Sequence, residues 1–226
     1  MDNARPTPLL EDSDATREKL EGWLSKRRGR PVTIPQLTIP ESTGMSNVTL
    51  LFDMEWEENG APRSEAVVAR LQPEIERPVF PGYDLSLQYE VMDAVGRASD
   101  IPVPQLRGLE LDTSLLGVQF YLMKHTQGRI PTDMPPYNMD GWMMHETSVT
   151  QRETLWRTAV ETMAAFHRLD YKTLGFEKLH EAGKTPLQQQ RDFRDQHIHR
   201  ATEGSGPLIR VAHCGWLTPN APPPRP

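Results

Sequence analysis

Short runs of apolar residues bounded by turn residues fill much of the first 130 positions and predict a small antiparallel sheet. The runs are rich in Val, Ile, Leu, Thr and aromatic residues, a composition typical of strands. They cover Thr33–Ile39, Val48–Trp56, Ala66–Leu71 and Gln119–Lys124. Between the second and third runs lies Glu57-Glu58-Asn59-Gly60, and its Asn-Gly pair predicts a hairpin turn.

Helical periodicity predicts one helix before this sheet and another that interrupts it. The first extends over Asp14–Arg28 and is closed by Gly29. The second extends from Asp84 to about Arg97. One face of the second helix carries Leu85, Gln88, Met92 and Val95.

After about residue 145 the pattern becomes helical throughout. Thr150–Glu153 reads as a capping box at the start of a long helix, and Thr185–Gln188 repeats the device with proline at the first helical position. A last short helix is expected at about Leu208–Leu217. These elements predict an α+β protein with two lobes, joined near His125–Gly128.

Composition narrows the class of protein. The 226 residues carry 25 Lys+Arg against 31 Asp+Glu, a formal net charge of −6 that argues against a nucleic-acid partner. The single cysteine, Cys214, excludes a disulfide framework and a cysteine-built zinc site. The longest apolar stretch, Leu115–Met123, is too short for a membrane span, and the N-terminus lacks the order of a secretion signal. We therefore expect a cytoplasmic protein without a membrane partner.

Four segments, in this order along the chain, resemble a known family. They are Gly44–Asn47 between two strands, Val67–Arg70 on a strand, Phe120–Gly128 at the lobe joint and Thr158–Asp170 on the long helix, with Glu90 on the interrupting helix. This order resembles the aminoglycoside phosphotransferase/choline kinase family, in particular the phosphotransferase domain of acyl-CoA dehydrogenase-associated proteins. The resemblance implies a protein-kinase-like fold, with a small antiparallel-sheet N-lobe crossed by one helix and an incomplete helical C-lobe.

The first element of the resemblance is a glycine-containing loop. A tight turn lets backbone N–H groups approach phosphate oxygens, and Gly44, Ser46 and Asn47 would fill this role. Taken alone, the loop equally fits an ordinary hairpin connection.

A cation on the third strand and a glutamate on the helix form the second element. In the family this cation holds the α- and β-phosphates of ATP and pairs with the glutamate. Here Arg70 stands in the place of the usual lysine, and Glu90 is the expected partner. Arginine keeps its charge and grips phosphate or carboxylate bidentately. The alternative is an exposed strand cation and a solvated helix face.

The third element is the connection between the lobes. By the resemblance, the backbone of Met123, Lys124 and His125 would read the adenine edge of ATP, and the Met123 side chain would pack nearby as an apolar wall. The alternative is the plain end of a core strand, with His125 on the surface.

The catalytic elements of the family are not found in this sequence. Family members use an H-x-D-x-x-x-x-N loop, whose aspartate accepts the hydroxyl proton, and a further aspartate that holds Mg²⁺. His167 and Asp170 are spaced differently and lack the asparagine, and Asp192 and Asp195 lie on an expected helix. We predict no catalytic and no metal-binding residue, and a chain that ends before the catalytic loop.

Three functions therefore remain open. The first is an ATP-dependent kinase that phosphorylates a hydroxyl group of a small molecule. The second is an inactive nucleotide-binding or interaction module, and the third an unrelated α+β binding protein. We expect the nucleotide-binding lobe at residues 1–127, the partial helical lobe at 128–218 and a Pro-rich tail at 219–226.

Overall fold

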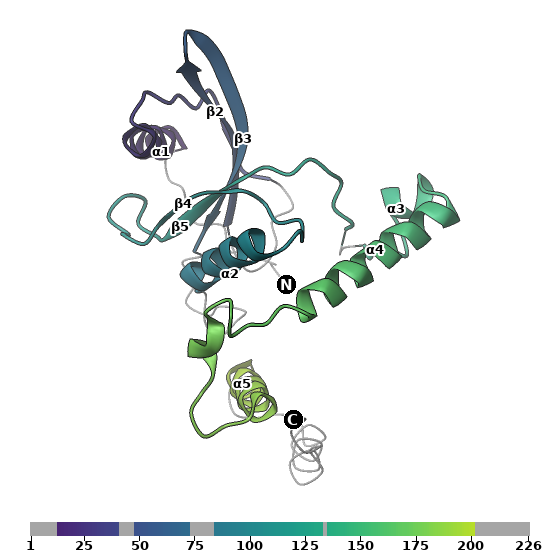
Figure 1. Cartoon of the computed structure of the whole chain (residues 1–226). Helices are drawn as coiled ribbons and strands as arrows, with labels where there is room; N and C mark the ends of the chain where they lie inside the picture. Colours follow the sequence, from purple (N-terminus) through teal and green to yellow (C-terminus); the bar gives the residue numbers. More distant parts are fainter. Residues whose placement is uncertain (1–12, 41–47, 73–83, 133–134, 202–226) are drawn as a thin grey trace. The chain divides into compact units, whose positions relative to one another are not determined.

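The computed structural model describes residues 13–40, 48–72, 84–132 and 135–201, and it contains a five-stranded antiparallel sheet (Figure 1). The strand order is β1-β2-β3-β5-β4. The strands are β1 (Leu37–Thr38), β2 (Val48–Glu58), β3 (Ala61–Leu71), β4 (Leu106–Glu110) and β5 (Phe120–Lys124). The antiparallel sheet and the helices that follow it confirm the predicted α+β fold.

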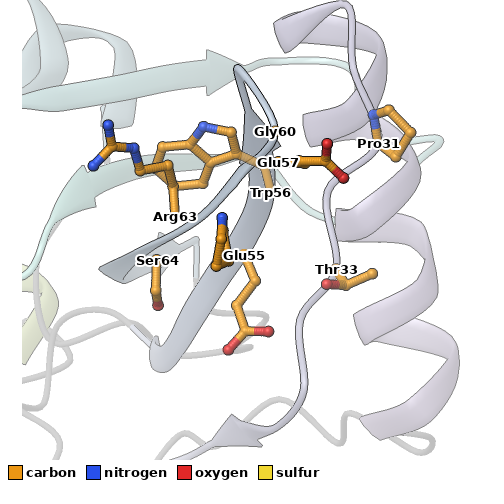
Figure 2. Close-up of a pocket in the computed structure, with 9 residues that line it drawn as sticks. Pro31, Thr33, Glu55, Trp56, Glu57, Gly60, Arg63 and Ser64 are labelled. Carbon is orange, nitrogen blue, oxygen red and sulfur yellow. The ribbon is translucent and has the colours of Figure 1, made fainter.

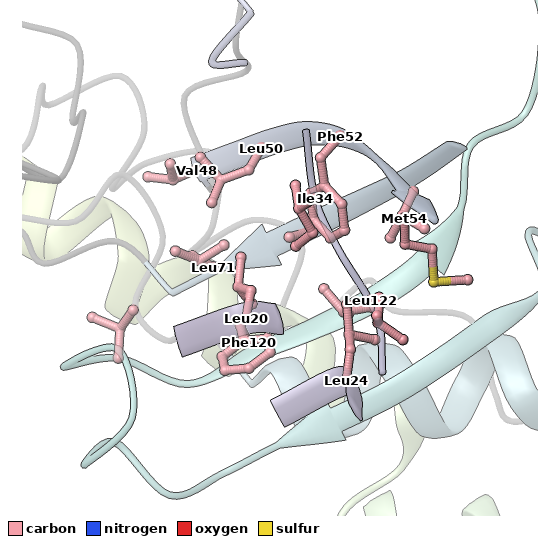
Figure 3. Close-up of a cluster of buried hydrophobic side chains, with 14 residues drawn as sticks. Leu20, Leu24, Ile34, Val48, Leu50, Phe52, Met54, Leu71, Phe120 and Leu122 are labelled. Carbon is pink, nitrogen blue, oxygen red and sulfur yellow. The ribbon is translucent and has the colours of Figure 1, made fainter. Parts of the chain in front are cut away.

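One face of the sheet carries the main hydrophobic core, which α1 (Ser13–Arg28) covers (Figure 3). Side chains alternate between the two faces of a strand, so every second residue of β2, from Val48 to Met54, lies on this face. Leu20 and Leu24 of α1 are almost fully buried against them. The remaining members of the core are Val32, Ile34, Leu50, Phe52, Val67, Ala69, Leu71, Val118, Phe120 and Leu122.

The β2–β3 hairpin turns at Asn59-Gly60, as the sequence predicts. Asn59 has φ 54° and Gly60 has φ 76°, the positive pair that a tight turn of this kind requires. Strand β3 begins at Ala61, five positions before the predicted start at Ala66. Pairing with β2 continues through these exposed residues because the turn brings the two backbones together immediately after Gly60.

The first predicted strand, Thr33–Ile39, is largely wrong. Only Leu37 and Thr38 pair with β2 as a strand, and Thr33 forms an isolated bridge with Glu55. Pro35 interrupts the run, and proline has no N–H to donate to a ladder.

Strand β4 was not predicted from the sequence. It has a register irregularity between Leu106 and Gly108, and Gly108 has φ 148°. A Cβ atom on Gly108 would lie 2.6 Å from the ring of Trp23, so the close approach of α1 requires glycine here. The Trp23 indole N–H also donates to the Glu110 carboxylate at 2.7 Å. These contacts with α1 stabilise β4, whose own sequence is too short and irregular to show a strand pattern.

The predicted helix between the strands is confirmed as α2 (Leu85–Ala98). Its N-cap is Asp84, whose carboxylate accepts a hydrogen bond from the Leu87 backbone N–H at 2.8 Å. Leu85 and Val95 are buried, as expected for residues of the predicted apolar face. The contacts of α2 with β4 and β5 place it against the sheet.

The helical part of the chain begins after β5. It comprises α3 (Trp142–His145), α4 (Val149–His167), the 3-10 helix η1 (Phe176–Leu179) and α5 (Pro186–Ala201). The capping box at Thr185–Gln188 is confirmed: the Gln188 backbone N–H donates to the Thr185 hydroxyl at 3.2 Å, and the Gln188 amide oxygen accepts from the Thr185 backbone N–H at 2.8 Å.

The box predicted at Thr150–Glu153 is wrong by two residues. Ser148 is the N-cap of α4. Its hydroxyl accepts a hydrogen bond from the Gln151 backbone N–H, and the Gln151 amide oxygen accepts one from the Ser148 backbone N–H. Ser148 has the extended backbone that an N-cap requires, whereas Thr150 already lies within the helix.

The apolar face of α4 is uncovered in the part of the chain that the structure describes. No residue of this helix is buried. The exposed apolar side chains along it are Val149, Leu155, Trp156, Val160, Met163 and Phe166.

The chain divides into two compact units. The sheet, α1, α2, α3 and α4 belong to the first unit, and η1 and α5 belong to the second. The predicted lobe boundary at residues 127 and 128 remains a prediction. Among the described helices, none has the length and apolar character needed to cross a membrane. The helix predicted at Leu208–Leu217 and the Pro-rich tail lie outside the described residues.

Candidate functional site

The predicted phosphate loop is not part of the described structure. Gly44, Ser46 and Asn47 all lie within residues 41–47, which fall outside the described ranges. Strand β2 begins immediately after this segment, at Val48. The role of the loop therefore remains a prediction.

Arg70 lies near the end of β3, on the sheet face opposite the main core. Its register partners are Thr49 on β2 and Tyr121 on β5, so the three side chains form one row across the sheet. The Arg70 guanidinium donates from Nη1 to the Thr49 hydroxyl at 2.8 Å. Arg70 is half-buried, so its charge is partly shielded from water. An arginine in this setting can bind an anion that approaches the sheet face.

Tyr121 is the residue of this row on β5, and it was not predicted as a site residue from the sequence. Only 4% of it is exposed, and burial raises the pKa of its phenol above the ordinary value, while the charge of Arg70 acts in the opposite direction. Its hydroxyl lies 3.5 Å from the Gln88 amide oxygen on α2. Its ring meets the ring of Tyr89 edge-on, with centroids 6.1 Å apart.

A signal for Tyr121 was present in the sequence. It lies between Phe120 and Leu122, and alternation along a strand puts it on the face opposite those two core residues. A tyrosine at such a position needs a partner for its hydroxyl.

Glu90 lies on α2, as predicted, and it is half-buried. The Ser86 hydroxyl lies 3.5 Å from its carboxylate. A helix turns by about 200° over two residues, so Glu90 and Gln88 point in nearly opposite directions around α2. Among the α2 side chains, those of Gln88 and Tyr89 both meet Tyr121 of the row that also contains Thr49 and Arg70. An ion pair between Arg70 and Glu90 remains a prediction.

The predicted hinge lies at the end of β5. Met123 is the register partner of Val68, on the same sheet face as Arg70 and Tyr121. The backbone N–H of Lys124 donates to the Gln105 carbonyl at 2.7 Å, and that of His125 donates to the Ala66 carbonyl at 2.8 Å. These two N–H groups hold neighbouring segments of the sheet, and adenine recognition by this segment remains a prediction.

The carboxylates considered for catalysis lie on separate parts of the chain. Asp192 lies on α5, where Lys184 is 2.9 Å away and holds the pKa of this carboxyl below its ordinary value. Asp195 lies on the same helix, and Asp170 lies between α4 and η1. Across the described ranges, no group of three or more His, Cys, Asp and Glu side chains could hold a metal ion. The residues described here therefore do not fit a Mg²⁺ site.

Two hollows of moderate size lie away from the Arg70 row. The first has a volume of about 470 Å³ and lies beside the turn of the β2–β3 hairpin (Figure 2). Its lining consists of Pro31, Thr33, Glu55, Trp56, Glu57, Gly60, Pro62, Arg63 and Ser64. The second, of about 430 Å³, lies between residues 99–102 and the polar side of α4. Neither hollow is lined by a predicted site residue.

A family model matches most of this chain. Residues 61–226 match the model described as APH, phosphotransferase enzyme family. This match covers β3, α2, β4, β5 and all of the helices that follow.

Among curated proteins, the chain is similar to two much longer ones. It is 24% identical over 182 residues to a protein of Arabidopsis thaliana named as an acyl-CoA dehydrogenase, IBR3, covering 79% of this chain and 20% of that protein. It is 28% identical over 183 residues to acyl-CoA dehydrogenase family member 11 of Gallus gallus, covering 80% and 21%. The chain therefore spans about a fifth of the length of these relatives.

A solved structure supports the fold. A chain from Ralstonia eutropha that carries the name aminoglycoside phosphotransferase superposes with a TM-score of 0.54 and 23% sequence identity. The superposition covers 88% of this chain and 52% of the other. At this level of identity the likeness shows the fold, and it confirms the kinase-like architecture.

Proposed function

Because the chain belongs to the APH phosphotransferase enzyme family, we propose that it binds ATP on the α2-facing side of the sheet, for transfer of a phosphoryl group to a hydroxyl of a small molecule. The observation that carries the proposal is the position of Arg70. Arg70 is the register partner of Tyr121, on the sheet face opposite the main core.

The chemistry of this face fits a nucleotide. Val68 and Met123 form an apolar pair two residues along the strands from Arg70 and Tyr121. Two residues of a strand span about 7 Å, so a flat base resting on the apolar pair would direct its phosphates toward Arg70. Arginine binds phosphate bidentately with charge-assisted hydrogen bonds.

The remaining predicted contacts complete this proposal. Gly44, Ser46 and Asn47 would bring backbone N–H groups to the phosphates, and the segment from Met123 to His125 would border the base. Because the N–H groups of Lys124 and His125 already donate within the sheet, we assign the recognition of adenine to other polar groups of this segment. The proposal includes a cytoplasmic location.

The test is a nucleotide titration of the 226-residue protein by calorimetry. We expect Arg70→Ala to weaken ADP binding by tenfold or more and to leave adenosine binding unchanged, because the guanidinium would contact only the phosphates. Arg63→Ala is the matched control, since Arg63 is an exposed arginine on the same strand, near the hairpin turn. Equal ADP affinity in the wild type and Arg70→Ala would place the phosphates elsewhere and overturn the proposal.

A second candidate function is a nucleotide-binding module that does not itself transfer phosphate. It is favoured by the sequence, which contains no H-x-D-x-x-x-x-N pattern. We assign no catalytic step to Mg²⁺, because the described residues do not fit a metal site. The test is transfer from radiolabelled ATP, with Mg²⁺ present, to aminoglycosides, choline-like alcohols and hydroxyacyl thioesters. Binding without transfer supports the module. Transfer that disappears in Asp170→Asn, Asp192→Asn or Asp195→Asn would identify a catalytic carboxylate in this chain.

A further inference from the structure

The row that contains Arg70 extends from the sheet to α2 through a single buried side chain. Thr49, Arg70 and Tyr121 come from three adjacent strands, and the Tyr121 hydroxyl lies 3.5 Å from Gln88 on the helix. The contact between the Tyr121 and Tyr89 rings, with an interplanar angle of 70°, fixes the position of the phenol under the helix. Tyr121 therefore lies next to Arg70 in the register of the sheet and contacts the helix that packs over this face.

Protonation sets the direction of each hydrogen bond in this row. A guanidinium has only donors, so Arg70 donates to the Thr49 hydroxyl, and toward its register partner Tyr121 it can act only as a donor to the phenol oxygen. Burial favours the neutral phenol, which keeps its proton for the Gln88 amide oxygen. The phenol can thus accept from Arg70 while it donates to Gln88 on α2, a combination that neither phenylalanine nor a second cation could supply.

Arginine has several rotatable bonds, and its hold on an anion depends on the orientation of its planar head. The Thr49 hydroxyl fixes the guanidinium on one side at 2.8 Å, and Tyr121 lies on the other side of it in the register of the sheet. Such a two-sided arrangement reduces the side-chain entropy that would otherwise be lost on binding.

We propose that Tyr121 is the positioning residue for Arg70, and that through Gln88 it makes the orientation of the guanidinium depend on the position of α2. This inference rests on the proposed function only in that a phosphate group is taken as the anion that Arg70 binds. It assigns to Tyr121 and Gln88 a link between the sheet and α2 that does not require the predicted Arg70–Glu90 ion pair.

The test is Tyr121→Phe in the full chain. Phenylalanine keeps the ring against Tyr89 and removes only the hydroxyl. We expect ADP affinity to fall about tenfold, the usual effect of losing a hydrogen bond to a charged group, while adenosine affinity stays unchanged. Tyr137→Phe is the matched control, because it makes the same chemical change at a half-exposed tyrosine outside the sheet.

A double-mutant cycle separates positioning from a general loss of structure. In an Arg70→Ala background, Tyr121→Phe should cause no further loss of ADP affinity, because the group that it positions is gone. If the second substitution weakens binding equally in both backgrounds, Tyr121 acts independently of Arg70 and the inference is wrong.

The outcomes also distinguish this inference from the proposed function. If Arg70→Ala weakens ADP binding and Tyr121→Phe does not, only the inference fails. If Arg70→Ala has no effect on ADP binding, the proposed phosphate site fails. The contact can then be tested without nucleotide, by NMR of the guanidinium protons of Arg70. Faster exchange of these protons with water in Tyr121→Phe supports the contact, and unchanged exchange overturns it.

Discussion

Arg107 on β4 donates two hydrogen bonds to the carboxylate of Glu65 on β3, although β5 lies between these two strands. The distances are 2.5 Å from Nε to Oε1 and 2.7 Å from Nη2 to Oε2. Both side chains are largely shielded from water, with 23% and 17% of their surfaces exposed. The ion pair thus links the edge strand β4 to the central strand β3.

Arg107→Ala should destabilise the protein. It removes a bidentate ion pair and leaves the Glu65 carboxylate partly buried without its main partner, so we expect the free energy of unfolding to fall by about 1–2 kcal/mol. Urea denaturation measures this change. Arg97→Ala is the control, because the ion pair of Arg97 with Asp93 is highly exposed and should contribute less than about 0.5 kcal/mol. An equal decrease in the free energy of unfolding in the two variants would contradict a special role of the ion pair between Arg107 and Glu65.

The same pair should make stability depend on pH. The hydrogen bond from Arg107 is the main cause that holds the pKa of Glu65 below its ordinary value, against the opposing effect of burial. A carboxyl with a lowered pKa in the folded state stabilises the protein above its unfolded-state pKa, and this contribution is lost as the pH falls through the folded-state pKa. In Arg107→Ala we expect the free energy of unfolding to decrease less than in the wild type as the pH falls into the acid range. Thermal unfolding at a series of pH values from neutral to acidic measures this, and parallel profiles would contradict it.

The start of α4 provides a third prediction. Ser148 caps the helix and forms a reciprocal box with Gln151, so Ser148→Ala should destabilise the first turn by about 1 kcal/mol. Thr150→Ala, two residues later and inside the helix, should have little effect. Amide hydrogen exchange in the first turn of α4 distinguishes them. Faster exchange in Thr150→Ala than in Ser148→Ala would show that the helix begins at the position expected from sequence alone.

Local patterns in the sequence were sufficient for much of the fold. The Asn59-Gly60 turn, the helix α2, and the box at Thr185–Gln188 each depend on residues a few positions apart, and each is confirmed. Where two local signals competed, as at Ser148 and Thr150, the sequence pattern selected the wrong one. Both positions carry a hydroxyl, and three residues after each lies a side chain that can accept a hydrogen bond from the backbone N–H of the capping residue. Only the backbone conformation distinguishes the two positions.

The sequence by itself also determined that Arg70 lies on an apolar strand, that Glu90 lies on the interrupting helix, and that the order of motifs resembles the phosphotransferase family. Tertiary structure decided which side chains meet. Strand register aligned Thr49, Arg70 and Tyr121, and the packing of α2 turned Gln88 toward them. Similarly, β4 became a strand through its pairing with β5, and Arg107 reached Glu65 from a position 42 residues away. Such pairings depend on hydrogen bonds and packing between segments distant in sequence, and no local pattern of apolar and polar residues records them.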